Sequence, residues 1–118
     1  MSQSVTIYHN PRCSKSRETL ALLQQQGIEP QVVLYLDTPP DAATLSQLIT
    51  QLGFAGAREL MRRKDDLYRE LNLDDDSLSE AQLIDAMVTH PKLIERPIVI
   101  ANGRAKLGRP PEQVLDIL

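Results

Sequence analysis

The sequence predicts an α/β fold in which a four-stranded mixed sheet has flanking helices and carries a helical insertion. Two short strand-like segments near the N-terminus enclose an amphipathic helix, and a charged, helix-rich stretch follows. An Asn-Gly pair near the C-terminus then joins two more strand-like segments as a hairpin. Because 118 residues are the length of one domain, we expect a single domain over residues 1–118, with its insertion at about residues 41–90.

The N-terminal part reads as a strand, a helix and a second strand. Residues 5–8 are β-branched and aromatic, and Pro11 breaks the strand pattern after them. Leucines at helical spacing predict a helix over residues 14–26, which Gly27 closes. The apolar residues 31–36 predict the next strand. The intervening helix is long enough to connect two parallel strands.

The middle of the chain is predicted to be helical. Apolar residues recur at helical spacing over residues 42–52, and Gly53 is expected to end that helix. Residues 57–71 predict one or two short, charged helices. Residues 79–82, Ser-Glu-Ala-Gln, fit a capping box that opens a further helix, and the pair at residues 90–91, His-Pro, ends it.

The C-terminal part reads as a hairpin followed by a helix. Residues 97–101 predict a strand, the Asn-Gly pair at residues 102–103 predicts a tight turn, and residues 104–107 pair back antiparallel. The two prolines at residues 110–111 suit the first turn of a final helix over residues 112–118. A two-plus-two set of strands with flanking helices is typical of a thioredoxin-like fold, here with a helical insertion.

The composition excludes several classes of protein. The chain has 13 Lys and Arg against 16 Asp and Glu, a net charge of −3, so it lacks the positive surplus of a general nucleic-acid binder. No apolar run approaches the length of a membrane span, and the first residues do not resemble a secretory signal. We therefore expect no nucleic acid and no membrane as partners. The single cysteine favours a reducing, cytoplasmic location.

That cysteine, Cys13, falls where the loop after the first strand meets the predicted helix. The unpaired N–H groups at a helix start favour negative charge and lower the pKa of a thiol placed there. Arg12, Lys15 and Arg17 add positive potential, and the Ser16 hydroxyl can donate to an anion. This setting predicts a nucleophilic thiolate.

Plainer interpretations stay open for these residues. Cys13 could be an unreactive thiol that fills a core gap. His9, at the end of the first strand, could face the thiolate across the loop, or could simply bond to backbone. One cysteine and two distant histidines do not form a metal-ligand set. Thr19 stands where a cysteine-based phosphatase needs an arginine, which argues against that class.

Residues 9–17 read His-Asn-Pro-Arg-Cys-Ser-Lys-Ser-Arg. This segment matches the H-N-P-x-C-x-x-S-R signature of the arsenate reductases coupled to glutathione and glutaredoxin, the ArsC family. Segments similar to that family fall along nearly the whole chain, at residues 34–36, 59–62, 83–84, 95–99 and 108–111. The sequence thus resembles the short, single-cysteine branch of this family.

The resemblance implies that Cys13 is the catalytic nucleophile. It also implies three arginines that contact the oxyanion, which by matching motifs are Arg62, Arg96 and Arg109. We add His9 and Arg17 to the predicted catalytic residues, and Ser16 to those predicted to bind substrate.

Guanidinium groups form forked, charge-assisted bonds to the oxygens of arsenate, as they do to phosphate, which makes the three arginines chemically plausible. By itself, however, Arg62 in its Arg-Arg-Lys-Asp-Asp run is more typical of a solvated helical face with internal ion pairs. By analogy with the thioredoxin fold, the Arg96–Pro97 peptide is a candidate for the cis form.

The sequence therefore predicts a monomeric arsenate reductase with no bound cofactor and no metal, in which glutathione is a co-substrate and glutaredoxin the partner. Two other functions stay open. One is an Spx-like transcriptional regulator that binds RNA polymerase, although Ser16 stands where such regulators carry the second cysteine of their redox switch. The other is a thiol oxidoreductase that acts on another substrate, such as a glutathione mixed disulfide.

Overall fold

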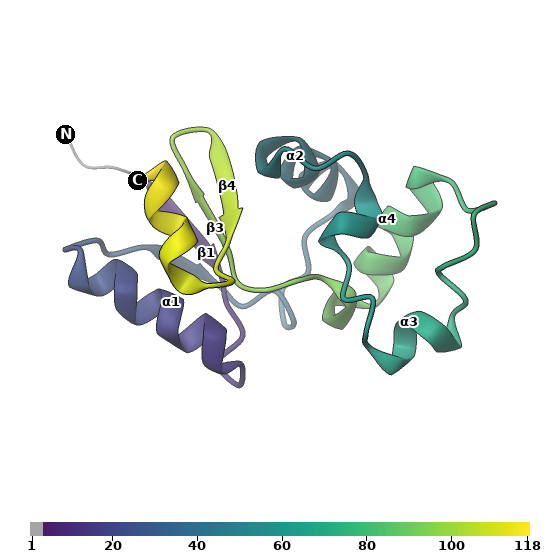
Figure 1. Cartoon of the computed structure of the whole chain (residues 1–118), viewed down its shortest axis with the longest axis horizontal. Helices are drawn as coiled ribbons and strands as arrows, with labels where there is room; N and C mark the ends of the chain where they lie inside the picture. The colour runs from purple at the N-terminus through teal and green to yellow at the C-terminus, as the bar shows by residue number, and fades with distance from the viewer. Residues whose placement is uncertain (1–3) are drawn as a thin grey trace. The chain divides into compact units, whose positions relative to one another are not determined.

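The computed structural model describes residues 4–118, which form two compact units. Residues 4–38 and Arg96–Leu118 make the first unit, drawn in purple to blue and in yellow-green in Figure 1. Pro39–Glu95 makes the second unit and includes the whole predicted insertion at about residues 41–90. Our expectation of one domain across the chain stays a prediction. Within residues 4–118, no helix has both the length and the apolar character needed to cross a membrane.

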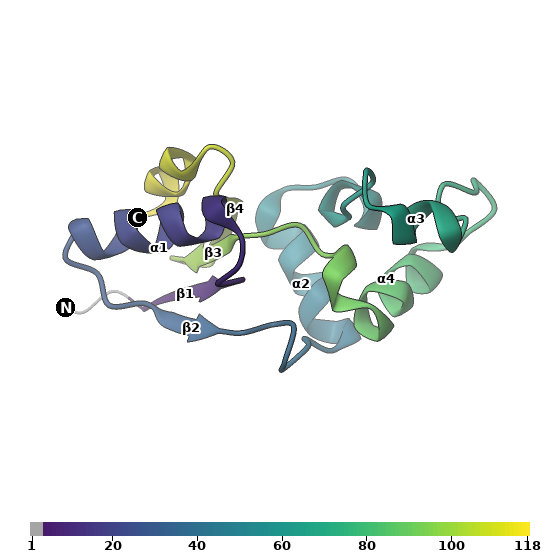
Figure 2. The ribbon, with the colours of Figure 1, turned by 90° about the horizontal axis from the view of Figure 1, so that it is seen from below.

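The first unit contains a four-stranded mixed sheet, as predicted. Its strands are β1 (Val5–Tyr8), β2 (Gln31–Val33), β3 (Ile98–Ala101) and β4 (Arg104–Leu107), and their order is β2-β1-β3-β4. Strands β1 and β2 run parallel, whereas β3 is antiparallel to both β1 and β4. The parallel pair is connected through α1 (Ser14–Gln25), and Figure 2 shows this helix lying along one side of the sheet.

The hairpin between β3 and β4 is the one that the sequence predicted. Asn102 and Gly103 have φ angles of 56° and 74°, so both adopt the left-handed conformation that a two-residue hairpin turn of this kind requires. The turn sets Ala101 opposite Arg104. The Asn102 side chain also donates to the carbonyl oxygen of Ile117 at 2.8 Å, which fixes the C-terminal segment to the hairpin.

Strand β2 is shorter than the predicted strand over residues 31–36, because the chain turns at Leu34. The carbonyl oxygen of Leu34 accepts hydrogen bonds from the N–H groups of Asp37 and Thr38, both at 2.9 Å. This turn ends the ladder at Val33. Tyr35 is buried within the turn, whereas Leu34 itself is about half exposed, at 40%.

The last helix also differs from the prediction, because it is a 3-10 helix over Pro111–Ile117 (η3). Its first hydrogen bond runs from the N–H of Gln113 to the carbonyl oxygen of Pro110, a spacing of three residues. The seven-residue segment that begins at Pro111 and follows Pro110 thus forms the tighter helix. The prediction for α1 is confirmed within one residue, and Gly27 has a φ of 77° at its C-terminal end.

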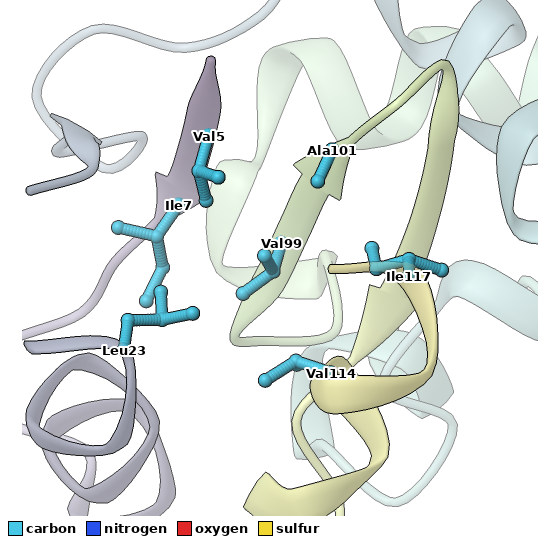
Figure 3. Packing of buried hydrophobic residues seen from close by; sticks show 7 residues of the cluster. All are labelled: Val5, Ile7, Leu23, Val99, Ala101, Val114 and Ile117. Carbon is cyan, nitrogen blue, oxygen red and sulfur yellow. The ribbon is translucent and has the colours of Figure 1, made fainter. Parts of the chain in front are cut away.

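The core of the first unit is aliphatic and joins the sheet to α1 and η3. Figure 3 shows these side chains pointing toward one another from both strands and helices. The cluster consists of Val5, Ile7, Leu23, Val99, Ala101, Val114 and Ile117. Burial of such side chains contributes roughly 1.5–3 kcal/mol each for the larger ones. The core therefore fixes the first and last thirds of the chain to each other.

The second unit is built from short helices. These are α2 (Ala42–Leu52), η1 (Ala57–Leu60), α3 (Asp66–Glu70), α4 (Glu80–Thr89) and η2 (Pro91–Leu93). Their buried apolar side chains include Leu45, Leu48, Leu60, Leu83 and Met87. The predicted helix over residues 42–52, the left-handed Gly53 that ends it and the capping box between Ser79 and Gln82 are all confirmed.

Candidate active site

Cys13 occupies the N-cap position of α1, in the first unit. Its backbone is extended, with φ −95° and ψ 124°, and its thiol makes no capping hydrogen bond. Its N–H donates to the carbonyl oxygen of Asn10 at 3.0 Å, and its own carbonyl oxygen accepts from the N–H of Arg17 at 3.0 Å. The side chain is half-buried rather than sealed in the core. The sulfur is thus held at the helix start with one side open.

The surroundings of this thiol favour its ionised form. Burial raises the pKa of Cys13, but the net direction is below the ordinary value, because four nearby groups stabilise the thiolate. These groups are the backbone N–H of Ser16, the Arg96 guanidinium, the backbone N–H of Lys15 and the Arg109 guanidinium, in decreasing order of effect. The predicted thiolate setting therefore has a physical basis in the helix start and in two arginines from the C-terminal third of the chain.

Arg109 contacts the thiol directly. Its Nη2 lies 3.8 Å from Cys13 Sγ, and its Nε donates to the carbonyl oxygen of Arg96 at 2.8 Å. Arg96 has a buried Nε for which residues 4–118 supply no hydrogen-bond partner. A buried guanidinium N–H without an acceptor is costly, so this group is suited to an anionic ligand.

A backbone hydrogen bond joins the two segments that carry these arginines. The N–H of Gly108 donates to the carbonyl oxygen of Pro97 at 3.0 Å, so the segments before β3 and after β4 lie side by side. The Arg96–Pro97 peptide, which the analogy with the thioredoxin fold named as a candidate, is cis, and the Arg109–Pro110 peptide is cis as well, which we did not predict.

His9 and Ser16 face the interior rather than the open side of the thiol. His9 Nδ1 and Ser16 Oγ are 2.6 Å apart, and the same hydroxyl accepts from the N–H of Asn10 at 3.0 Å. Ser16 is completely buried, and no hydrogen bond within residues 4–118 joins His9 to Cys13. The backbone N–H of Ser16 thus lowers the pKa of the thiol, while the Ser16 hydroxyl, which we expected to contact substrate, is engaged inside the fold.

The same arrangement determines the charge of His9. Burial and, to a smaller extent, the positive charge of Arg17 lower the pKa of His9, so the ring is neutral at neutral pH. Arg17 itself donates through Nη1 to the carbonyl oxygen of Pro11 at 3.0 Å and closes the loop before α1. The Lys15 side chain pairs with Glu18 at 3.5 Å, which offsets part of its positive potential.

Arg62 lies in the second unit, between η1 and α3, where acidic side chains surround it. Its Nη1 is 3.3 Å from Asp65 Oδ2 and its Nε is 4.0 Å from Glu95 Oε1. The backbone N–H of Arg62 donates to the carbonyl oxygen of Leu93 at 2.7 Å. These ion pairs match the plainer interpretation of Arg62, although the residue is not on a helical face. Its predicted contact with substrate stays a prediction.

The close contact between Gly108 and Thr19 escaped the sequence analysis. Gly108 packs closely against α1, and the buried Thr19 of α1 is the neighbour that it meets. The sequence signals at Gly108 were its position after a predicted strand and next to Arg109, and its place in the family-like segment at residues 108–111. Within residues 4–118, no group of three or more His, Cys, Asp or Glu side chains is arranged to hold a metal ion.

Comparison with known proteins gives concordant results. A family model described as "ArsC family" matches residues 8–117. The protein YfgD of Escherichia coli K12 is 69% identical over 118 residues, covering 100% of this chain and 99% of that relative. An arsenate reductase of Neisseria meningitidis serogroup A is 54% identical, covering 97% of each chain.

Solved structures agree with these sequence matches. A structure described as an arsenate reductase from Vibrio cholerae superposes with a TM-score of 0.98 at 61% identity, covering 100% of both chains. A second, from Yersinia pestis, has a TM-score of 0.95 at 68% identity, covering 97% of this chain and 100% of its own. With the sheet order described above, these likenesses confirm the predicted thioredoxin-like fold.

Proposed function

Because the chain belongs to the ArsC family, we propose that it is an arsenate reductase whose nucleophile is Cys13. The observation that carries this proposal is the position of the Arg109 guanidinium, 3.8 Å from Cys13 Sγ. The unpartnered Nε of Arg96 and the lowered pKa of the thiol support it. So do the names of several relatives, which are called arsenate reductases.

In the first step, the thiolate attacks the arsenic atom of arsenate, an As–S bond forms, and one arsenate oxygen leaves as water after protonation. The arsenate oxygens carry negative charge, which Arg96 and Arg109 offset through charge-assisted hydrogen bonds. The N-terminal end of α1 also offsets this negative charge. His9, neutral and bonded to Ser16, supports the first turn of the helix in this scheme.

The second step needs two electrons, and the chain has one cysteine. We propose glutathione as the source. Its thiolate attacks the sulfur of Cys13, the As–S bond breaks, and the electron pair stays on arsenic, which leaves as arsenite. Cys13 and glutathione are then joined by a disulfide. A glutaredoxin thiol attacks the glutathione sulfur and releases the Cys13 thiol for the next cycle. A reducing cytoplasm would supply both reductants.

The family resemblance also assigns a substrate contact to Arg62. Since Arg62 is paired with Asp65 and Glu95 in the second unit, its recruitment to an anion would require it to exchange partners. The KM for arsenate of the variant Arg62→Gln tests this assignment separately from the assignments of Arg96 and Arg109.

The deciding experiment is a coupled assay with arsenate, glutathione and glutaredoxin in which arsenite is measured. We expect turnover by the wild-type protein and a loss of at least about 100-fold in Cys13→Ser, because a hydroxyl is far less nucleophilic than a thiolate. Arg104→Gln, at an exposed position of β4, is the control and should retain activity. Full activity of Cys13→Ser would exclude the scheme. Turnover of a glutathione mixed disulfide without any arsenite formation would instead identify a thiol oxidoreductase of different specificity.

A further inference from the structure

Gly108 packs more closely against its neighbours than any side chain would allow. A Cβ atom at this position would lie 2.7 Å from Pro97 Cγ and still closer to Thr19 Oγ1, inside the distance that real Cβ atoms reach. Gly108 is not among the residues with a positive φ. The requirement for glycine is therefore one of space and not of backbone conformation.

The neighbour on the helix side is fixed. Thr19 is completely buried on α1, and its hydroxyl donates to the carbonyl oxygen of Lys15 at 2.8 Å. Ser16, one turn before it, is completely buried as well and is tied to His9. The start of α1 presents its N–H groups to Cys13. Because Thr19 is buried and its hydroxyl is bonded, the Thr19 side chain cannot move out into solvent to make room for a new side chain at position 108.

The neighbour on the other side is Pro97, which follows Arg96, and Gly108 itself precedes Arg109. The N–H of Gly108 donates to the carbonyl oxygen of Pro97 at 3.0 Å, and Arg109 Nε donates to the carbonyl oxygen of Arg96 at 2.8 Å. These two bonds join the segment at residues 96–97 to the segment at residues 108–109. A displacement of Gly108 away from α1 would therefore move the guanidinium groups of Arg96 and Arg109 together.

We propose that Gly108 is a positioning residue of the thiol site: its missing side chain lets Thr19 pack directly on the loop after β4, and this close approach sets the distance between Arg109 and Cys13. Gly108 has no chemistry of its own here. It acts through Arg109, whose Nη2 lies 3.8 Å from the sulfur, and through Arg96. This inference concerns the same site as the proposed function, but it can be measured on the thiol alone, without arsenate.

The test is the rate at which iodoacetamide alkylates Cys13 in the full, reduced chain, measured as a function of pH. In Gly108→Ala we expect alkylation at neutral pH to slow about three- to tenfold, because withdrawal of two positive charges raises the thiol pKa. Arg109→Gln should slow alkylation in the wild-type background and add little in Gly108→Ala. A loss of thermal stability alone, with an unchanged pH profile, would overturn the proposal and leave Gly108 a purely structural residue.

Substitutions of Thr19 test the same contact from the helix side. Thr19→Ala in the Gly108→Ala background should restore part of the alkylation rate, because it removes the two Thr19 atoms that the new Cβ meets and leaves only the contact with Pro97 Cγ. Thr19→Val, which keeps the shape and removes the hydroxyl, is the matched control and should leave the pH profile unchanged. If Gly108→Ala does not fold, Thr19→Ile adds bulk to the same contact and should slow alkylation by itself. An unchanged profile in Thr19→Ile, or no recovery in the double variant, would contradict the proposal.

Discussion

The arginines of the two units differ in what neutralises them. In the second unit, Arg62 pairs with Asp65 and Glu95, and Lys92 joins the cluster at 3.6 Å from Asp65. In the first unit, no carboxylate within residues 4–118 forms a salt bridge with Arg96 or Arg109. The Arg109 guanidinium instead donates to the carbonyl oxygen of Arg96 and to the Cys13 thiol, and the Nε of Arg96 has no partner within residues 4–118. Positive charge that the protein leaves without a counterion is positive charge available to an anionic ligand.

The two groups of arginines therefore differ in what their removal changes: ion pairs in the case of Arg62, and the setting of the thiol in the case of Arg96 and Arg109. Removal of a carboxylate from the Arg62 cluster breaks exposed or half-buried ion pairs, which contribute little to stability. Removal of Arg96 or Arg109 leaves the thiol without its nearest cations. Substitutions in the two clusters should therefore affect different measured quantities.

The largest effect is expected on turnover. Arg109→Gln should lower kcat/KM for arsenate by about 10- to 100-fold, because it removes a charge-assisted hydrogen bond from the oxyanion site. Arg104→Gln, the matched control, should change it less than about twofold, as is usual for exposed charges. A steady-state assay with both variants measures the contrast. Equal kcat/KM values would show that Arg109 does not contact the substrate.

The next largest effect is expected on the free energy of unfolding, when the buried hydrogen bond between His9 and Ser16 is removed. Ser16→Ala should lower the free energy of unfolding by about 1–3 kcal/mol, because it leaves the buried His9 ring and the N–H of Asn10 without their partner. Urea denaturation provides the measurement. Wild-type stability in this variant would mean that His9 and Asn10 find other partners.

The ionisation of Cys13 should appear as a pH dependence. A thiol whose folded pKa is lowered contributes stability that is complete above its unfolded pKa of about 8.5, and that is lost as the pH falls through the folded pKa. The difference in unfolding free energy between wild type and Cys13→Ser should therefore grow, under reducing conditions, as the pH rises from below the folded pKa of the thiol to above about 8.5. A difference that is constant over this range would mean that the folded and unfolded thiols have the same pKa.

The smallest effect is expected in the Arg62 cluster. Asp65 accepts the N–H of Leu67 at 2.9 Å, and this bond, more than the charges of Lys92 and Arg62, lowers the pKa of its carboxyl. Asp65→Asn keeps the cap and removes the charge, so it should cost less than about 1 kcal/mol at neutral pH. That cost should vanish as the pH falls below the folded pKa of Asp65. The rate of Cys13 alkylation should not change.

Local signals in the sequence predicted most of the fold. The Asn-Gly turn at residues 102–103, the capping box at Ser79 and the left-handed Gly53 each depend on a few neighbouring residues, and each is confirmed. The end of β2 was wrong because nothing at residues 31–36 shows that the carbonyl oxygen of Leu34 closes a turn with Asp37 and Thr38. The final helix was predicted at residues 112–118 and lies at Pro111–Ile117, but no local signal showed that it is a 3-10 helix.

The candidate site was less visible in the sequence than the fold. The position of Cys13 at a helix start follows from local pattern, but the placement of Arg109 beside it joins residues 96 positions apart. Only the family resemblance pointed to that residue. The bond between His9 and Ser16 lies within residues 9–17, but the pattern of that segment did not show that the bond faces inward. The contact of Gly108 with Thr19 joins two distant segments, and neither segment specifies it alone.

The central claim is that arginines without counterions form an oxyanion site next to a reactive sulfur. Its most direct test is the rate of Cys13 alkylation at neutral pH as arsenate is added, in the absence of glutathione. In the wild-type protein, arsenate should slow alkylation in a saturable way, and in Arg109→Gln the concentration needed should rise at least about tenfold. No protection in the wild-type protein, or the same protection in Arg109→Gln, would contradict the account.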